Sequence, residues 1–114
     1  RLLAGDRAPD ATVRDADGHS SRLFKLFQGA HWTLLGYEVE RGALKPAAGL
    51  HIHHFGPAGD LVDDQRQFKD AYNLAPGEWV LVRPDGYVGA IITHDDLEAL
   101  HRYLAQVGLS AETF

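Results

Sequence analysis

Residues 77–92 read Gly77-Glu78-Trp79-Val80-Leu81-Val82-Arg83-Pro84-Asp85-Gly86-Tyr87-Val88-Gly89-Ala90-Ile91-Ile92. Two apolar, β-branched runs flank the tetrapeptide Arg83-Pro84-Asp85-Gly86. Proline presets φ for the second position of a type I turn, and glycine can take the left-handed conformation that starts the return strand. The stretch therefore predicts a β-hairpin with Gly86 at positive φ.

The first strand of this hairpin is apolar on both faces. Because side chains alternate along a strand, Trp79 and Leu81 point to one face while Val80 and Val82 point to the other. Such a strand is typical of a sheet that is covered on both sides. We therefore expect the hairpin to be the spine of a sheet with helices on its two faces.

Arg83 is the one charge in this apolar strand. Long basic side chains in such places extend their charged end toward water or toward an acidic group. We expect Arg83 to pair with Asp85 or another carboxylate, and a contact to a neighbouring domain is the functional alternative.

Three places in the chain together resemble a known family. The run 80–88 resembles the signature of the C-terminal domain of flavin-dependent aromatic hydroxylases, the phenol-hydroxylase-like monooxygenases. Gly5-Asp6-Arg7-Ala8-Pro9-Asp10 resembles the opening of that domain, and Trp32-Thr33-Leu34-Leu35 resembles its next strand. The resemblance implies an α/β, thioredoxin-like fold, a central mixed sheet flanked by helices, here without the Cys-x-x-Cys motif. Residues 1–114 would form this single domain, as the C-terminal piece of a longer flavoprotein.

The same resemblance implies a function for the longer protein. The parent would be an FAD- and NAD(P)H-dependent aromatic-ring hydroxylase whose flavin site and chemistry lie in an upstream flavin domain. These residues alone would bind no cofactor, perform no catalysis, and have a structural or dimer-stabilising role in a cytoplasmic protein. The partners are then the upstream flavin domain and, in the dimer-stabilising role, a second copy. A free-standing, cysteine-less thioredoxin-like binding module with an unknown ligand is the alternative.

Composition excludes several classes of function. The chain contains no cysteine, which removes dithiol redox chemistry, thiol nucleophiles and zinc–thiolate sites, and with them an enzyme of the peroxiredoxin or thioredoxin type. The net charge is −5 and no basic stripe is present, so we expect no nucleic-acid partner. The sequence contains no run of about 18 apolar residues, so we expect no membrane span. The chain begins with Arg1 rather than methionine, which favours a piece of a longer protein.

Turn residues and periodicity predict the elements of the first half. The sequence favours a hairpin over 11–23 around Asp15-Ala16-Asp17-Gly18, with Gly18 at positive φ. A short helical turn over 22–29 and strands over 32–39 and 50–55 follow. Residues 40–49 are expected to form a loop or a stub of helix, because Gly42 and Pro46 interrupt helical continuity.

Two helices are predicted in the second half. Residues 60–73 have Leu61, Phe68 and Tyr72 at helical spacing, with Asp60, Asp63 and Asp64 near the positive N-terminal end. Residues 95–107 have an apolar stripe of Leu97, Leu100, Leu104 and Val107, with Thr93 and Asp96 at capping-box spacing and Gly108 as the stop. Thioredoxins have a cis-proline before this last hairpin; Pro76 is the nearest candidate here, and its isomer is left open.

Three histidines on the predicted strand 50–55 are candidate metal ligands. His51 and His53 share a face of the strand and could chelate a metal, whereas His54 points away. A site needs a third or fourth ligand, and the neighbouring sequence offers none. We therefore favour polar residues at the solvent end or edge of a strand and predict no metal site.

Asp17, His19, Ser20 and Ser21 contain the ingredients of nucleophilic catalysis. They fall in a turn where Asp, Gly and Ser are favoured for backbone reasons, and adjacency in sequence does not make a triad. We therefore favour the turn, and no catalytic residue is predicted here.

Two pairs of acidic residues lie at the ends of predicted elements. Glu38 and Glu40 share a face at a strand end, where a carboxylate pair is conceivable but solvated charge is favoured. Asp95 and Asp96 are explained by the start of the last helix. The sequence contains no Gly-x-Gly-x-x-Gly or Gly-Lys-Ser/Thr run, so it predicts no phosphate or cofactor site.

Overall fold

The computed structural model describes residues 2–39, 48–56, 59–93 and 96–109. The elements follow in the order β1 (Thr12–Asp15), β2 (Ser20–Arg22), α1 (Leu23–Phe27), β3 (Trp32–Tyr37), β4 (Leu50–Phe55), β5 (Leu61–Asp63), α2 (Gln67–Tyr72), β6 (Trp79–Val82), β7 (Val88–Ile92) and α3 (Leu97–Gln106). Most of the segment predicted as a loop, residues 40–47, lies outside the described residues.

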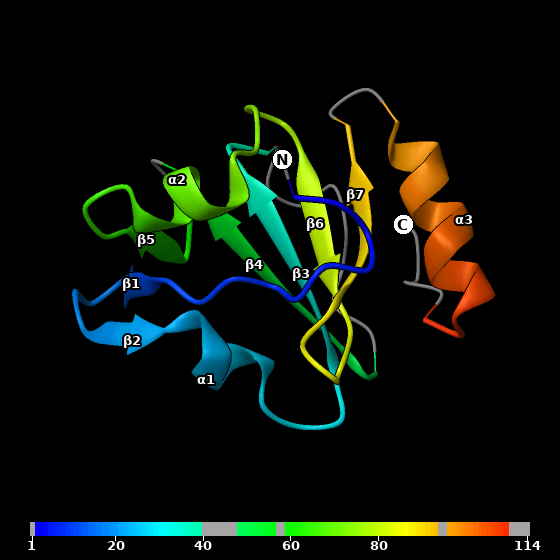
Figure 1. The fold of residues 1–114 in the computed structure, drawn as a ribbon, viewed down its shortest axis with the longest axis horizontal. Helices are drawn as coiled ribbons and strands as arrows, with labels where there is room; N and C mark the ends of the chain where they lie inside the picture. Colours follow the sequence, from blue (N-terminus) through cyan, green and yellow to red (C-terminus); the bar gives the residue numbers. More distant parts are fainter. Residues whose placement is uncertain (1, 40–47, 57–58, 94–95, 110–114) are drawn as a thin grey trace.

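The strands form one mixed sheet in the order β2-β1-β5-β4-β3-β6-β7 (Figure 1). The pairs β3–β4 and β4–β5 are parallel, and the other neighbouring pairs are antiparallel. The mixed sheet predicted from the family resemblance is therefore confirmed.

Helices cover the sheet on both faces. One core packs α1 and α2 against the sheet, and the other packs α3 against the opposite face; Figure 1 shows α3 apart from α1 and α2. Val80 and Val82 belong to the first core, while Trp79 and Leu81 belong to the second. The prediction of a strand with two apolar faces is confirmed, because all four residues of β6 are buried.

The hairpin itself is confirmed, but its predicted place in the sheet is wrong. The amide of Gly86 donates a hydrogen bond to the carbonyl of Arg83 over 2.9 Å, and Gly86 has φ of +86°. β7 is nevertheless an edge strand, and the middle of the sheet is formed by β4 and β3. The physical reason is that β4, β5 and the first hairpin extend the sheet on the far side of β3.

The N-terminal segment lies beside the start of β7. The amide of Gly5 donates to the carbonyl of Val88, the amide of Val88 donates to the carbonyl of Asp6, and the amide of Ala8 donates to the carbonyl of Gly86, each over 2.8 Å. The two sequence motifs at the start and near the end of the chain are thus joined by backbone hydrogen bonds.

The helix predicted over 60–73 is largely wrong. Residues Leu61–Asp63 form β5, which pairs antiparallel with β1, and the helix occupies only Gln67–Tyr72. Gln65 and Arg66 have φ of +54° and +62°, values that a right-handed helix does not allow. The helical spacing of the buried pair Phe68 and Tyr72 is real, but Leu61 is buried from a strand.

The last helix is confirmed with a different N-cap. The Asp96 carboxylate, not Thr93, caps α3 and accepts a hydrogen bond from the Ala99 amide over 3.2 Å. Gly108 has φ of +80° and follows the helix as predicted, and the Leu109 amide donates to the Leu104 carbonyl over 2.7 Å.

The remaining fold predictions are also settled by the backbone. The first hairpin and α1 are confirmed, with Gly18 at φ of +87°. β3 ends at Tyr37, two residues before the predicted end of the strand. The peptide bond before Pro76 is trans. None of the described helices has the length and apolar character needed to cross a membrane.

Candidate functional site

The end of β3 is where a thioredoxin-like fold places its Cys-x-x-Cys turn. Here Glu38 follows β3 with φ of +48°, and its amide donates to the carbonyl of Phe55 over 2.8 Å. Glu38 also borders a hollow of about 370 Å³ together with Tyr37, Phe55 and Val62. No thiol can stand at this end of β3, because the chain contains no cysteine, and Glu38 is the first described residue after the strand. Glu40, the other member of the carboxylate pair that the sequence left open, lies outside the described residues.

Asp60 brings two of the three strand histidines together. His53 Nδ1 lies 2.7 Å from Asp60 Oδ2, and the backbone amide of His54 donates to Asp60 Oδ1 over 2.6 Å. His54 Nδ1 lies 3.7 Å from Asp60 Oδ1. Partial burial raises the pKa of the Asp60 carboxyl, but the hydrogen bonds from His53 and His54 outweigh it and lower the pKa below its usual value. Sequence reasoning missed this cluster because it assigned Asp60 to a helix start.

His51 belongs to a different contact. Its ring stacks on that of His31 with centroids 3.7 Å apart, and His31 Nε2 lies 2.7 Å from the Leu26 carbonyl oxygen. Burial, followed by the charges of His31 and His53, lowers the pKa of His51. The rings of His51 and His53, the pair that was considered as metal ligands and not favoured, contact different residues: His51 stacks on His31, and His53 contacts Asp60.

The polar residues of the first hairpin turn hold the backbone. Asp15 Oδ1 accepts hydrogen bonds from the amides of Asp17 and His19, both over 2.9 Å. The hydrogen bond from the His19 amide is the main cause that lowers the pKa of Asp15. Asp15, Asp17 and His19 could together offer three metal-ligand atoms, but His19 and Asp17 are exposed and the turn accounts for all three.

The two serines that were weighed as catalytic candidates lie on β2. Ser20 is opposite Arg14 and Ser21 is opposite Val13 in the ladder with β1. Their backbone positions serve the hairpin, as the sequence interpretation favoured.

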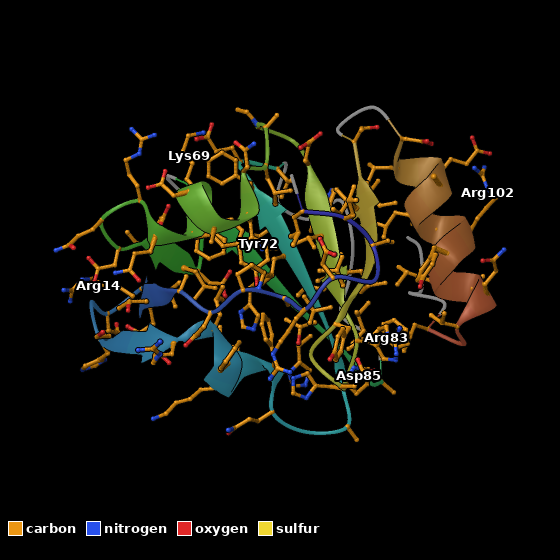
Figure 2. All side chains as sticks on the ribbon, in the orientation of Figure 1. Arg14, Lys69, Tyr72, Arg83, Asp85 and Arg102 are labelled. Carbon is orange, nitrogen blue, oxygen red and sulfur yellow. The ribbon has the colours of Figure 1, made fainter. Side chains whose placement is uncertain are left out.

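The other charged candidates also have structural roles. Arg83 Nη2 pairs with Asp85 Oδ2, which confirms the predicted partner, and both side chains lie at the hairpin end in Figure 2. Asp96 caps α3, whereas Asp95 lies outside the described residues. These groups stabilise turns and helix ends, and none of their contacts assembles a nucleophile with a base.

Comparisons with known proteins decide the family. Residues 1–108 match the model of the family that is described as "Aromatic-ring hydroxylase, C-terminal". The chain belongs to this family. It is 37% identical over 107 residues to a flavin-dependent monooxygenase of Mycobacteroides abscessus, an alignment that covers 93% of this chain and 18% of that protein. The chain therefore spans about a fifth of the length of that relative.

Solved structures with similar backbones identify the fold of this chain. The flavin-dependent monooxygenase PieE, solved with FAD and substrate, aligns with a TM-score of 0.78 and 24% identity over 94% of this chain and 20% of that one. A thiol:disulfide interchange protein from Bacteroides sp. aligns with a TM-score of 0.64 and 16% identity over 91% of both chains. The fold is thioredoxin-like, and it carries no cysteine.

The motif 5–10 holds neighbouring elements of the fold together through hydrogen bonds. The Tyr72 hydroxyl donates to the Pro9 carbonyl over 2.6 Å, and burial followed by the charge of Asp10 raises the pKa of Tyr72, which stays a neutral donor. Asp10 Oδ1 accepts from the Phe24 amide over 3.1 Å at the start of α1, and Asp10 Oδ2 accepts from Arg22 Nε over 2.6 Å. The residues that carry the resemblance thus fasten the N-terminal segment to the hairpin and to both helices of one face.

Proposed function

We propose that this chain is the non-catalytic C-terminal domain of an FAD- and NAD(P)H-dependent aromatic-ring hydroxylase, with a structural role beside an upstream flavin domain. The single observation that carries the proposal is the family match over residues 1–108, combined with a relative of which this chain spans only 18%. The rest of such a longer protein, outside the part that this chain matches, would hold the flavin site and the substrate site.

The residues of the chain do not fit FAD. A dinucleotide pyrophosphate is usually held by a glycine-rich turn that opens a helix, and the sequence has no Gly-x-Gly-x-x-Gly run. The Glu38 hollow is bordered by two carboxylates, Glu38 and Asp63, which would repel phosphate. We therefore assign no step of flavin chemistry to these residues.

The described polar groups favour a structural role. Asp10, Asp15, Asp63 and Asp96 each accept backbone amide hydrogen bonds that hold turns or helix ends. Without a thiol, and with these four carboxylates engaged in backbone hydrogen bonds, the domain contributes packing rather than chemistry. A dimer-stabilising role is the second form of this proposal.

The full reading frame that contains this chain provides the test. We expect its product to bind FAD and to oxidise NADH or NADPH faster when a phenol or polycyclic aromatic substrate is added, with a hydroxylated product found by mass spectrometry. Sedimentation of the same product with and without residues 1–114 tests the dimer. A full-length product without flavin and without reduced-nicotinamide oxidation would contradict the proposal.

A further inference from the structure

Arg7 lies between two exposed aromatic rings that come from distant parts of the chain. Its guanidinium carbon is 5.8 Å from the ring centroid of Phe24 in α1 and 5.8 Å from that of Tyr87 in the hairpin. Phe24 is 41% exposed and Tyr87 is 38% exposed, although large aromatic side chains are usually covered. The two rings and the cation form one continuous surface, which we call the Arg7 surface.

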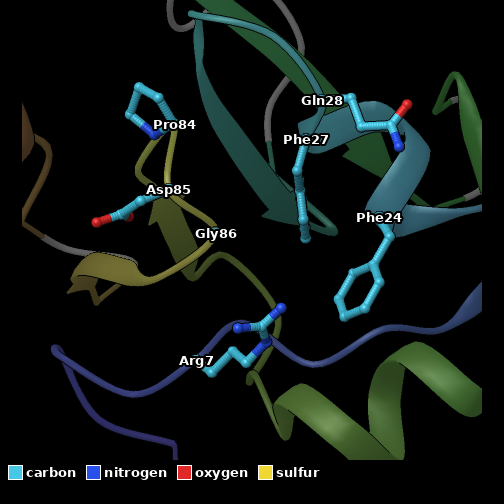
Figure 3. Close-up of a pocket in the computed structure, with 7 residues that line it drawn as sticks. All are labelled: Arg7, Phe24, Phe27, Gln28, Pro84, Asp85 and Gly86. Carbon is cyan, nitrogen blue, oxygen red and sulfur yellow. The ribbon is translucent and has the colours of Figure 1, made fainter.

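A hollow of about 230 Å³ opens at this surface. Figure 3 shows Arg7 reaching into it, with Phe24 and Phe27 on one side and the turn Pro84-Asp85-Gly86 on the other. Its lining combines two aromatic rings, a proline, Gln28, the Arg7 cation and Asp85, whose carboxylate is paired with Arg83. Such a lining favours a partner that presents a negative charge within an apolar setting.

The cation in the hollow is not neutralised within the described part of the chain. No described carboxylate lies within 4.0 Å of the Arg7 guanidinium, and the nearby carboxylate of Asp85 is paired with Arg83. A guanidinium offers five N–H donors in a planar fork that matches a carboxylate in two-point contact. Among the residues that the structure describes, the Arg7 guanidinium therefore has no carboxylate as an ion-pair partner.

A polypeptide that precedes residue 2 would begin close to this surface. Leu2, the first described residue, is five residues before Arg7, a span of at most about 18 Å in extended chain. The segment from Gly5 to Ala8 is fixed to the hairpin by backbone hydrogen bonds. Any domain upstream of residue 2 is consequently tethered close to the hollow, at a high effective concentration.

We propose that the Arg7 surface is the docking site for the upstream domain of the same polypeptide, which inserts an aspartate or glutamate side chain into the hollow. The carboxylate binds the Arg7 guanidinium, and the apolar groups around it pack on Phe24 and Tyr87. This inference rests on the proposed function, because it requires an upstream domain.

Photo-crosslinking in the full-length protein tests the proposal. p-Benzoylphenylalanine replaces Phe24, and in a matched control it replaces Arg102, an exposed residue of α3 on the opposite face (Figure 2). We expect Phe24-derived crosslinks within one polypeptide to peptides upstream of residue 2, and none from position 102. Arg7→Glu should reduce the crosslink yield by about fivefold or more, while Arg102→Glu leaves it unchanged.

The outcomes separate this proposal from the proposed function. The flavin spectrum of the same sample reports on the parent enzyme independently, and circular dichroism reports whether each variant is folded. Two outcomes in a yellow, folded protein overturn the docking site alone. In one, the benzoylphenylalanine at position 24 gives no crosslink; in the other, it joins two copies into a dimer. A product with no flavin and no upstream domain overturns both. Restoration of the Arg7→Glu yield by replacing the crosslinked acidic residue with arginine would support the ion pair.

Discussion

At the scale of single residues, Gly86 shows how a turn position restricts the sequence. It has φ of +86°, and a Cβ added there would meet no heavy atom within 4 Å. A side chain at this position therefore causes conformational strain rather than a clash. The cost for a β-branched residue is about 1–2 kcal/mol, out of a net stability of about 5–15 kcal/mol.

We expect Gly86→Val to lower the thermal unfolding midpoint by several degrees, given roughly 4–8 °C per kcal/mol for domains near this size. Gly86→Asn should cause a smaller decrease, because asparagine tolerates the left-handed region. Calorimetry or circular dichroism measures both midpoints. Equal midpoints for the valine variant, the asparagine variant and the wild type would contradict the strain argument.

The Asp60 carboxyl predicts a pH dependence of stability. Its pKa in the folded protein lies below the ordinary value of 3.8, so the fold favours the ionised form. The stabilisation is therefore complete above about pH 5 and is lost as the pH falls toward the folded pKa. The side chain is 40% exposed, so solvent screening reduces the effect.

We expect Asp60→Asn to have a lower unfolding midpoint than the wild type at pH 6, with the difference narrowing as the pH is lowered below 3.8. Chemical denaturation at a series of pH values measures it. A difference of the same size at pH 6 and pH 3 would show that the ionised carboxylate is not what stabilises the fold.

Residue-scale features differ in how far the sequence predicts them. Gly18, Gly86 and Gly108 were predictable because turn and helix-end chemistry is local. The Asp60 cluster could not be predicted, because its partners His53 and His54 lie on β4 and their contact with Asp60 depends on how the chain folds between these residues. The contact of Arg7 with two aromatic rings could not be predicted either, because Phe24 and Tyr87 are far apart in the sequence.

At the scale of elements, the region of β5 and α2 shows where periodicity fails. The apolar spacing of Leu61, Phe68 and Tyr72 fits a helix, but backbone pairing with β1 converts the first part into a strand. The left-handed residues Gln65 and Arg66 then reverse the chain into the helix. Sequence propensity gave no sign of them, because neither residue type favours positive φ.

Asp63 connects these two elements and provides a prediction. Its carboxylate oxygens accept hydrogen bonds from the amides of Phe68 and Lys69, over 2.7 and 2.9 Å, at the start of α2. We expect Asp63→Ala to destabilise the domain by about 0.5–2 kcal/mol, the usual cost of losing a helix cap. Asp64→Ala is the matched control, since Asp64 forms an ion pair with Arg14 at 3.6 Å. Urea denaturation that shows equal losses for both variants would refute the capping role.

At the scale of the whole molecule, the two-faced pattern of β6 predicted the layers correctly. The alternation of Trp79, Val80, Leu81 and Val82 assigns their side chains to opposite cores, and this follows from the period of a strand. The order of the strands could not be derived in the same way. The order depends on β5, whose residues the sequence predicts as part of a helix.

The absence of cysteine predicts the redox behaviour of the molecule. We expect no insulin-reducing and no peroxide-consuming activity, because no thiolate can form in this chain. The assay compares the chain with a no-protein blank and with a thioredoxin as positive control. Turnover above the blank would contradict the prediction.

The central claim is that cofactor chemistry lies outside these residues, and the flavin content of the isolated chain tests it most directly. Residues 1–114 are purified, mixed with excess FAD, freed of unbound cofactor and examined by absorption spectroscopy. The account predicts a colourless protein without flavin bands, because the chain has no pyrophosphate cradle. A stoichiometric flavin spectrum that survives the removal of free FAD would contradict it.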